Sequence, residues 1–353
     1  MTSLGTITDP TFAPKNQYSW WEKMALQFIR DERDLPFIPL LFKITFTLIP
    51  LAILLYIPGL PTWAWWTAAA AYFLINNFVF KGPFGLMLHC TSHRPFFKRE
   101  YEWMNKYIPW VLAPFFGNTP ETYYAHHIGM HHAENNLEDD ISSTMEYRRD
   151  SFSEFLRYFG NFFFKGIFQL LSYHRSKKRN WFLPRIIVGE YGFFLMCILL
   201  SLVNFPATLV VFILPFFIFR LITMMGNWTQ HAFVDPDDPE NLYKSSITCI
   251  NVKYNHKCWN DGYHISHHIR PSMHWTLHPK HFLDNLDEYR KNEAIVFDGL
   301  DFLPVFYHLM RKRYDVLAAH LVDLGNFEND EEAIAMLKKR TQFIPFASMV
   351  PAE

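Results

Sequence analysis

The sequence predicts an all-α integral membrane protein in which two transmembrane helical hairpins, four spans in all, are capped by a cytosolic helical domain. Half of the 353 residues are hydrophobic and 18% are aromatic, which is high for a water-soluble protein. Four apolar segments are long enough to cross the hydrocarbon core of a bilayer, which takes about 20 helical residues each. Histidines gather in short groups outside these four segments.

The first segment, 1–36, is expected to be cytosolic or interfacial, and 37–353 a single domain. The four spans lie at about 37–57, 62–80, 186–203 and 205–225. The turns "PGLPTW" and "NFP" are so short that the spans must pair into two hairpins, each entering and leaving on the same side of the membrane.

The distribution of basic residues predicts the orientation of these hairpins. Lysine and arginine are frequent between His89 and Arg185, whereas the two short turns contain none. By the positive-inside rule, 81–185, 226–353 and both termini are cytoplasmic. The start, "MTSLGTITDP", lacks the pattern of a cleavable signal peptide, so the internal spans of this multi-pass protein must direct its insertion.

Charge and cysteine content exclude other classes of protein. The net charge is −1 and the pI is near 7.0, so the chain has no basic footprint for nucleic acid. Its 4 cysteines are too few and too scattered for a disulfide framework or a zinc ribbon.

The histidines form three boxes and one further position. The boxes are "HCTSH", "HHIGMHH" and "HISHH", and "NWTQH" places a histidine four residues after Asn227. Spacings of three and four put side chains on one face of a helix, so each box can present its imidazoles to a common point. His126 falls off that face and is the weakest candidate. The predicted metal ligands are His89, His93, His127, His131, His132, His231, His264, His267 and His268.

These histidines predict a site for two metals at the cytoplasmic face. All of them lie at or beyond the cytoplasmic ends of the predicted spans, and nine imidazoles exceed what one tetrahedral ion can use. Imidazole suits iron, zinc and copper, and redox chemistry in a membrane enzyme favours iron. No catalytic side chain beyond the ligands and no organic cofactor site is predicted.

In these boxes and their order, the chain resembles the membrane fatty acid desaturase and hydroxylase superfamily, from His89 to His268 with the preceding hairpin. The resemblance implies that the nine histidines bind two iron ions, that Asn227 holds a metal-bound water, and that dioxygen is a co-substrate. The second box, HxxxHH, departs from the HxxHH of many acyl desaturases and is closer to membrane alkane hydroxylases. The reaction outcome therefore stays open.

Acidic residues near the boxes are expected to support the ligands. Metal-bound imidazoles usually donate their second ring N–H to a carboxylate or carbonyl, and the best two candidates are Asp140 and Asp261. The alternative for either residue is a solvated acidic loop.

The leading function is an oxygen-dependent desaturase that acts on acyl-lipid or acyl-CoA. The alternative is a hydroxylase or related oxygenase of the same superfamily, acting on fatty acyl, alkane, sphingoid or carotenoid chains. The sequence has no haem or iron–sulfur motif. The resemblance thus implies an external electron donor of the cytochrome-b5, ferredoxin or rubredoxin type. A transporter fits poorly, because transporter sites usually lie at mid-membrane.

Overall fold

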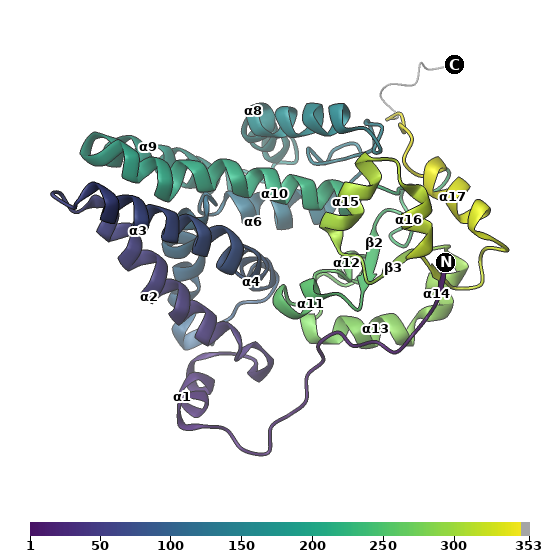
Figure 1. Ribbon diagram of the computed structural model, residues 1–353, viewed down its shortest axis with the longest axis horizontal. Helices are drawn as coiled ribbons and strands as arrows, with labels where there is room; N and C mark the ends of the chain where they lie inside the picture. The colour runs from purple at the N-terminus through teal and green to yellow at the C-terminus, as the bar shows by residue number, and fades with distance from the viewer. Residues whose placement is uncertain (347–353) are drawn as a thin grey trace. The chain divides into compact units, whose positions relative to one another are not determined.

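The computed structural model describes residues 1–346, which form two compact units. Unit 1 contains Met1–Thr11, His127–Tyr173 and the residues from Ile222 onward. Unit 2 contains Phe12–His126 and His174–Leu221. Most described residues are helical, as predicted, and Figure 1 follows them from purple at the N-terminus to yellow near the C-terminus.

Unit 2 is built mainly from long apolar helices, with short 3-10 and π-helical segments between them. Helix α2 packs against α3, α4 and α9. The helices are α1 (Trp20–Phe28), α2 (Phe37–Tyr56), α3 (Thr62–Leu74), α4 (Lys81–His93), α5 (Ala113–Phe116), α6 (Thr122–His126), α9 (Phe182–Thr208) and the first part of α10 (Leu214–Gln230). The 3-10 segments are η1 (Glu32–Asp34) and η3 (Arg99–Lys106), and the π-helical segments are η2 (Ile75–Phe80), η4 (Tyr107–Leu112) and η6 (Leu209–Ile213).

Two helical stretches among the described residues are long and apolar enough to cross a membrane: Glu32–Tyr56, with 25 residues, and Phe182–Gln230, with 49. The first covers the predicted span 37–57, and the second covers the predicted spans 186–203 and 205–225. The predicted span 62–80 corresponds to α3 followed by η2. Two membrane-spanning helices are thus supported by length and composition, and the full set of four stays a prediction.

The longer stretch is broken at the predicted "NFP" turn. The backbone of Asn204 is not helical (φ −157°, ψ 95°), and its Oδ1 accepts a hydrogen bond from Ala207 N at 3.1 Å. This asparagine therefore ends one helical segment and caps the next. Apolar side chains on both sides of the break are exposed, with Leu202 at 80% and Phe205 at 55%, which fits helices that face lipid.

Helix α4 carries the first histidine box, and its position within unit 2 is fixed by buried packing. Phe84 is fully buried and stacks on Phe116 with ring centroids 4.0 Å apart. Lys81, at the start of the helix, donates to the carbonyl oxygen of Phe116 at 3.3 Å. The helix ends before Arg94, which is extended because a residue that precedes proline disfavours the helical conformation.

Unit 1 is a set of short helices around two small parallel sheets. Strand β2 (Ile247–Ile250) pairs with β3 (Ile295–Asp298), and β1 (Thr2–Ser3) pairs with β4 (Val322–Asp323). The helical segments are η5 (His127–His131), α7 (His132–Glu134), most of α8 (Phe152–Ser176), the end of α10, α11 (Lys253–Lys257), α12 (His264–Ile269), η7 (Trp275–Leu277), α13 (His278–Asp284), α14 (Leu286–Lys291), α15 (Phe302–Met310), α16 (Tyr314–Ala319) and α17 (Asp330–Lys339).

The strands are a departure from the all-α prediction. The segments "ITCI" and "IVFD" are rich in β-branched and aromatic residues, which suit extended backbone, but each is only four residues long. Both strands are almost wholly buried, so their sequences lack the alternation of apolar and polar residues that indicates a half-exposed strand. Their pairing joins residues nearly fifty positions apart, with Ile247 opposite Ile295.

Arg149 organises the interior of unit 1 close to the end of α10. The side chain is fully buried and donates hydrogen bonds only to backbone carbonyls among the described residues. Burial lowers its pKa to about 9. Its acceptors are the carbonyl oxygens of Thr144, Met145, Tyr147, Ala232 and Arg340, so one side chain ties three separate segments together.

Candidate metal centre

The third histidine box is the helix α12, and all three of its histidines are buried. His264 and His268 are four residues apart and lie on one face, with ring centroids 4.6 Å apart. His267 is directed elsewhere: its Nε2 lies 2.9 Å from Nε2 of His132. The box therefore divides its imidazoles between two groups.

The second box divides in the same way, through a π-helical turn. In an α-helix, the spacing of four would place His127 on the same face as His131. In η5 and α7, however, Nε2 of His127 lies 3.1 Å from Nε2 of His132, five residues on. The wider π-helical turn pairs residues five apart, which an α-helical reading of the sequence does not foresee. His131 is left to join the other group.

His231 follows directly after α10 and is fully buried. Its Nδ1 lies 2.8 Å from the carbonyl oxygen of Ser245, and its Nε2 lies 3.3 Å from Nε2 of His264. The segment between α10 and β2, which contains His231 and Ser245, thus places this histidine against the third box. In the sequence, 33 positions separate it from His264.

Together these elements create what we term the four-histidine group, which lies wholly within unit 1. One ring nitrogen from each member can serve as a ligand, and these atoms all lie within 4.8 Å of one another. All four side chains are buried. The members are His131, His231, His264 and His268.

In three members of this group, the other ring nitrogen lies against an oxygen atom. Nδ1 of His131 donates to Oδ2 of Asp140 at 2.7 Å, and Nδ1 of His231 donates to a carbonyl, which can only accept. Nδ1 of His268 lies 3.0 Å from Oδ1 of Asn135. With Nδ1 protonated, each of these neutral rings keeps its lone pair on Nε2, the atom that faces the group.

Burial keeps two of these rings, those of His231 and His268, uncharged. It lowers the pKa of His231 to about 3, with a further contribution from the neighbouring His131. Burial and the adjacent histidines, His264 first, also hold the pKa of His268 well below its ordinary value. Neutral imidazole is the form that binds a metal ion, so the group is prepared for a cation at neutral pH.

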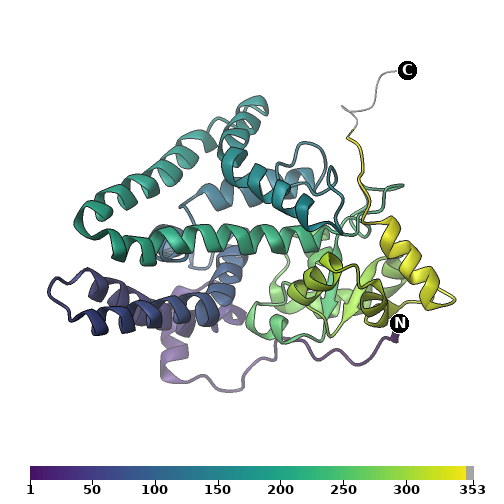
Figure 2. The same ribbon diagram turned by 45° about the horizontal axis from the view of Figure 1, so that its top comes forward.

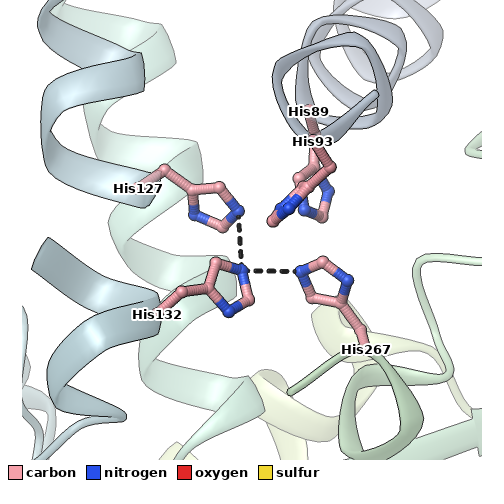
Figure 3. A group of neighbouring side chains, drawn as sticks. All are labelled: His89, His93, His127, His132 and His267. Atoms are coloured by element: carbon pink, nitrogen blue, oxygen red, sulfur yellow. Dashed lines mark hydrogen bonds between the residues drawn. The ribbon is translucent and has the colours of Figure 1, made fainter. Parts of the chain in front are cut away.

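The second group in unit 1 contains His127, His132 and His267, which are drawn in Figure 3 with their two Nε2–Nε2 contacts dashed. The first-box residues, His89 and His93, lie one turn apart on α4 of unit 2, with ring centroids 5.0 Å apart. Figure 3 also labels these two rings, which come from the same helix. Each predicted histidine thus lies next to at least one other.

The remaining predicted residues lie beside these groups. Nδ2 of Asn227 donates to Ser142 O at 2.9 Å and to the hydroxyl of Tyr158 at 2.7 Å. Oδ2 of Asp261 accepts from the hydroxyl of Tyr254 at 2.7 Å and from Nε2 of Gln230 at 3.3 Å. Asp261, three residues before the third box, thereby connects α11 to the end of α10, and its predicted support of a ligand stays a prediction.

Two ring partners were not foreseen from the sequence. Asn135 follows the second box in "HHAENN" and adopts a left-handed backbone (φ +50°), a conformation that asparagine tolerates. The amide in that position was a signal that the sequence offered. The carbonyl of Ser245 carried no such signal, since every residue has one and only the fold selects it.

The donor set fits metal ions on chemical grounds. Lone pairs on imidazole nitrogens about 3 Å apart repel one another unless a proton or a cation lies between them. Around an ion with metal–nitrogen bonds of about 2.1 Å, adjacent ligand atoms are separated by roughly 3.0–3.4 Å. The Nε2 atom of His264 lies 3.3 Å from that of His231 and 3.0 Å from that of His268. The spacing, the burial and the fixed tautomers therefore suit a bound transition metal.

Comparison with known proteins supports this reading of the histidines. The family model described as fatty acid desaturase matches residues 63–298, well over half of the chain and all nine predicted ligands. Neither the curated proteins nor the solved structures contain a match to the chain. The resemblance drawn from the histidine boxes is thus confirmed, and the chain belongs to the fatty acid desaturase family.

Proposed function

We propose that the protein is a di-iron, oxygen-dependent fatty acid desaturase, which introduces a double bond into a long chain carried as an acyl-lipid or an acyl-CoA. The observation that carries the proposal is the four-histidine group, which is buried and has three of its rings oriented by oxygen atoms, in a chain of the fatty acid desaturase family. A buried set of lone pairs has no evident role in a protein that binds no cation.

We assign the ligands to two ions. The four-histidine group holds one iron. His127, His132 and His267 hold the other, and we propose that His89 and His93 of unit 2 complete its ligand set. Two groups account for the division of the second and third boxes, because each box sends histidines to both. Asn227 is assigned a water on one of the irons.

Iron, when bound, supplies the dioxygen chemistry that removes hydrogen from an unactivated methylene, which no amino-acid side chain can do. In the overall reaction, a –CH2–CH2– unit, dioxygen, two electrons and two protons give –CH=CH– and two water molecules. Zinc, which also accepts imidazole ligands, has no redox chemistry to offer.

The protein's own contribution is to hold the ligand rings, to orient their Nε2 atoms and to keep bulk water out of the site. Asp140, Ser245 and Asn135 fix three rings through Nδ1, so the Nε2 atoms keep their direction through turnover. Burial of the four-histidine group excludes bulk water, which protects reactive oxygen chemistry from side reactions. Hydrogen bonds from Asn227 to Ser142 and Tyr158 hold its amide in place.

The substrate and the donor follow from chemistry and from the family. A long acyl chain partitions into the bilayer, and the apolar helices of unit 2 are suited to the same environment. We propose a multi-pass protein with both termini and the active site on the cytoplasmic side. We also propose, from the family resemblance, that the electrons come from a separate cytochrome-b5-type, ferredoxin or rubredoxin donor.

A hydroxylase is the second candidate, and the π-helical second box favours it. The HxxxHH spacing, closer to membrane alkane hydroxylases, is what brings His132 beside His127. In that reaction a C–H bond, dioxygen, two electrons and two protons give C–OH and one water molecule. The same iron ligands serve either outcome, so only the product distinguishes them.

The test is mass-spectrometric lipid profiling of cells that co-express the protein with each of the three donor types. His267→Ala is the inactive control, and His308→Ala, on α15 outside every box, is the matched histidine control. Acyl chains two hydrogens lighter than in the His267→Ala cells establish the desaturase, and double-bond localisation gives its position. Chains that gain one oxygen establish the hydroxylase. Profiles identical to the His267→Ala cells with all three donors reject both.

A further inference from the structure

The first eleven residues form an extended segment of unit 1, which we term the N-terminal strap (residues 1–11). Figures 1 and 2 show it as a purple trace that ends beside the yellow-green helices. Thr2 and Ser3 form strand β1 against β4. The N-terminal ammonium of Met1 lies 2.8 Å from Oδ1 of Asp330. The strap is therefore an integrated part of unit 1.

The apolar side chains of the strap pack on the core that contains the third histidine box. Leu4 and Ile7 contact a buried cluster whose members include Tyr263 and Ile265. Ile265 lies within α12, between the histidines, and Tyr263 directly precedes that helix. The strap thus packs on the same apolar core as the helix that carries the third box.

Asp9 is the polar centre of this contact. Only 5% of the residue is exposed, yet it carries a carboxylate. Oδ2 accepts hydrogen bonds from the hydroxyl of Tyr263 at 2.7 Å and from the backbone N–H of Asn251 at 2.8 Å. Burying a carboxylate is costly unless it is hydrogen-bonded; the two donors to Oδ2 offset part of that cost, while the buried Oδ1 has no hydrogen-bond partner among the described residues.

The loop that Asp9 holds is conformationally demanding. Asn251 and Asn260 both have left-handed backbones, at φ +56° and +57°. Nδ2 of Asn260 donates to Pro10 O of the strap at 2.7 Å. A Cβ on Gly262 would lie 2.5 Å from the carbonyl oxygen of Cys249, so that position requires glycine. Such a loop keeps its shape only when surrounding contacts determine it.

Tyr263 transmits this restraint to the ligands. Its ring is fully buried, and its carbonyl oxygen accepts a hydrogen bond from the backbone N–H of His267 at 3.1 Å. The same carbonyl accepts from Oγ of Ser266 at 3.0 Å.

We propose that the N-terminal strap is a positioning element for the third histidine box, with Asp9 acting through Tyr263 to set the direction of His264, His267 and His268. The inference rests on the proposed function in taking these histidines as iron ligands. Asp9 contacts neither the ions nor the substrate, so it is a positioning residue. Loss of its carboxylate leaves the ligands in place but widens their range of orientation.

The test uses the full-length protein loaded with ferrous iron, and it follows iron release to a chromogenic chelator. Asp9→Ala is expected to release iron about tenfold faster, in the range seen when partners of metal ligands are removed. Asp330→Ala, which breaks the exposed end of the same strap, is the matched control and is expected to release iron at the wild-type rate. Asp9→Asn, which keeps an acceptor oxygen for Tyr263, is expected to restore most of the retention.

A second variant keeps the test decisive if Asp9→Ala does not fold. Tyr263→Phe removes one hydroxyl and should also accelerate iron release. The double variant should release iron no faster than Asp9→Ala alone, because the two substitutions break the same hydrogen bond. The visible spectrum of the cobalt(II)-loaded protein, which reports ligand geometry, should change in Asp9→Ala and not in Asp330→Ala.

The outcomes separate this inference from the proposed function. Iron release and a cobalt spectrum in Asp9→Ala that match Asp330→Ala overturn the positioning role while the metal site stands. A wild-type protein that binds neither iron nor cobalt overturns the proposed function. In that case amide hydrogen exchange across 250–269 still tests the strap, which predicts faster exchange in Asp9→Ala than in Asp330→Ala.

Discussion

Asp140 offers the sharpest test of how the protein supports a bound metal, because N–H and O–H groups donate to both oxygens of its carboxylate and an amide cannot accept from all of them. Oδ2 accepts from Nδ1 of His131 at 2.7 Å and from the backbone N–H of Asn136 at 3.1 Å. Oδ1 accepts from the backbone N–H and the hydroxyl of Ser142, at 2.8 and 2.7 Å. The residue is 3% exposed, so water offers little replacement.

The substitution Asp140→Asn keeps the shape of the side chain but removes its negative charge and replaces one acceptor oxygen by an NH2 donor. In either orientation the new amide nitrogen faces two donors, so either the bond to His131 or the pair from Ser142 is lost. A charge-assisted bond of this kind contributes about 1.5–3 kcal/mol. Partners of metal-bound histidines typically change metal affinity by about 10- to 100-fold, which corresponds to about 1.4–2.7 kcal/mol. The two estimates agree.

The assay is competition for ferrous iron between the purified protein and a chelator of known affinity. Asp139→Asn, an exposed neighbour on the same loop, is the matched control and should retain wild-type affinity. The expected result is an affinity for the iron assigned to the four-histidine group at least tenfold lower in Asp140→Asn than in Asp139→Asn. Equal affinities in the two variants would refute the inference that the His131–Asp140 bond prepares a metal ligand.

Three further substitutions test other parts of the structure. His267→Ala should lower the iron content and abolish turnover, while His308→Ala should leave both nearly intact; full iron and activity in His267→Ala would mean that the ligands are misassigned. Asn227→Ala should reduce the turnover rate more than the iron content, since a water-mediated contact is weaker than a direct ligand, and an unchanged rate would exclude that role. Arg149→Met should lower the free energy of unfolding in detergent by about 2–4 kcal/mol, because it strands buried carbonyls. Arg148→Met removes a half-exposed side chain from its ion pair with Asp150 and should cost less than about 1 kcal/mol; similar losses in both variants would count against the interior role of Arg149.

The family and the helical character of the chain were predictable because both depend on local patterns. Apolar stretches of fixed length indicate membrane helices, and the break at Asn204 follows from asparagine and proline in "NFP". Histidine spacing is also local, so the boxes could be found without a structure. The assignment of each histidine to one of two irons stays a prediction.

The division of the boxes was not predictable from spacing. An α-helical face pairs His127 with His131, whereas the π-helical turn pairs it with His132. A π-helical turn costs local hydrogen-bond geometry and persists only where tertiary contacts favour it. Since those contacts come from α12, 135 positions away, the pairing is a property of the fold.

Contacts made by ordinary residues at long range were also beyond the sequence. Asp9 reads as a solvated residue near the N-terminus, yet it accepts a hydrogen bond from Tyr263, 254 positions later. Likewise, nothing in the sequence marks the backbone carbonyl of Ser245 as the partner of His231, because only the fold brings the two together. Asp140 could be suggested as a partner because it lies only nine positions after His131, within reach of local reasoning, and its contact with that ring leaves its support of a bound metal a prediction.

The central claim is that the histidines of this chain hold two irons, and the most direct measurement is the metal content of purified, active protein. Elemental analysis against protein concentration, run beside His267→Ala, should give two irons per chain for the wild type and a clearly lower content for the variant. Active protein that carries one metal per chain, or zinc in place of iron, would contradict the account.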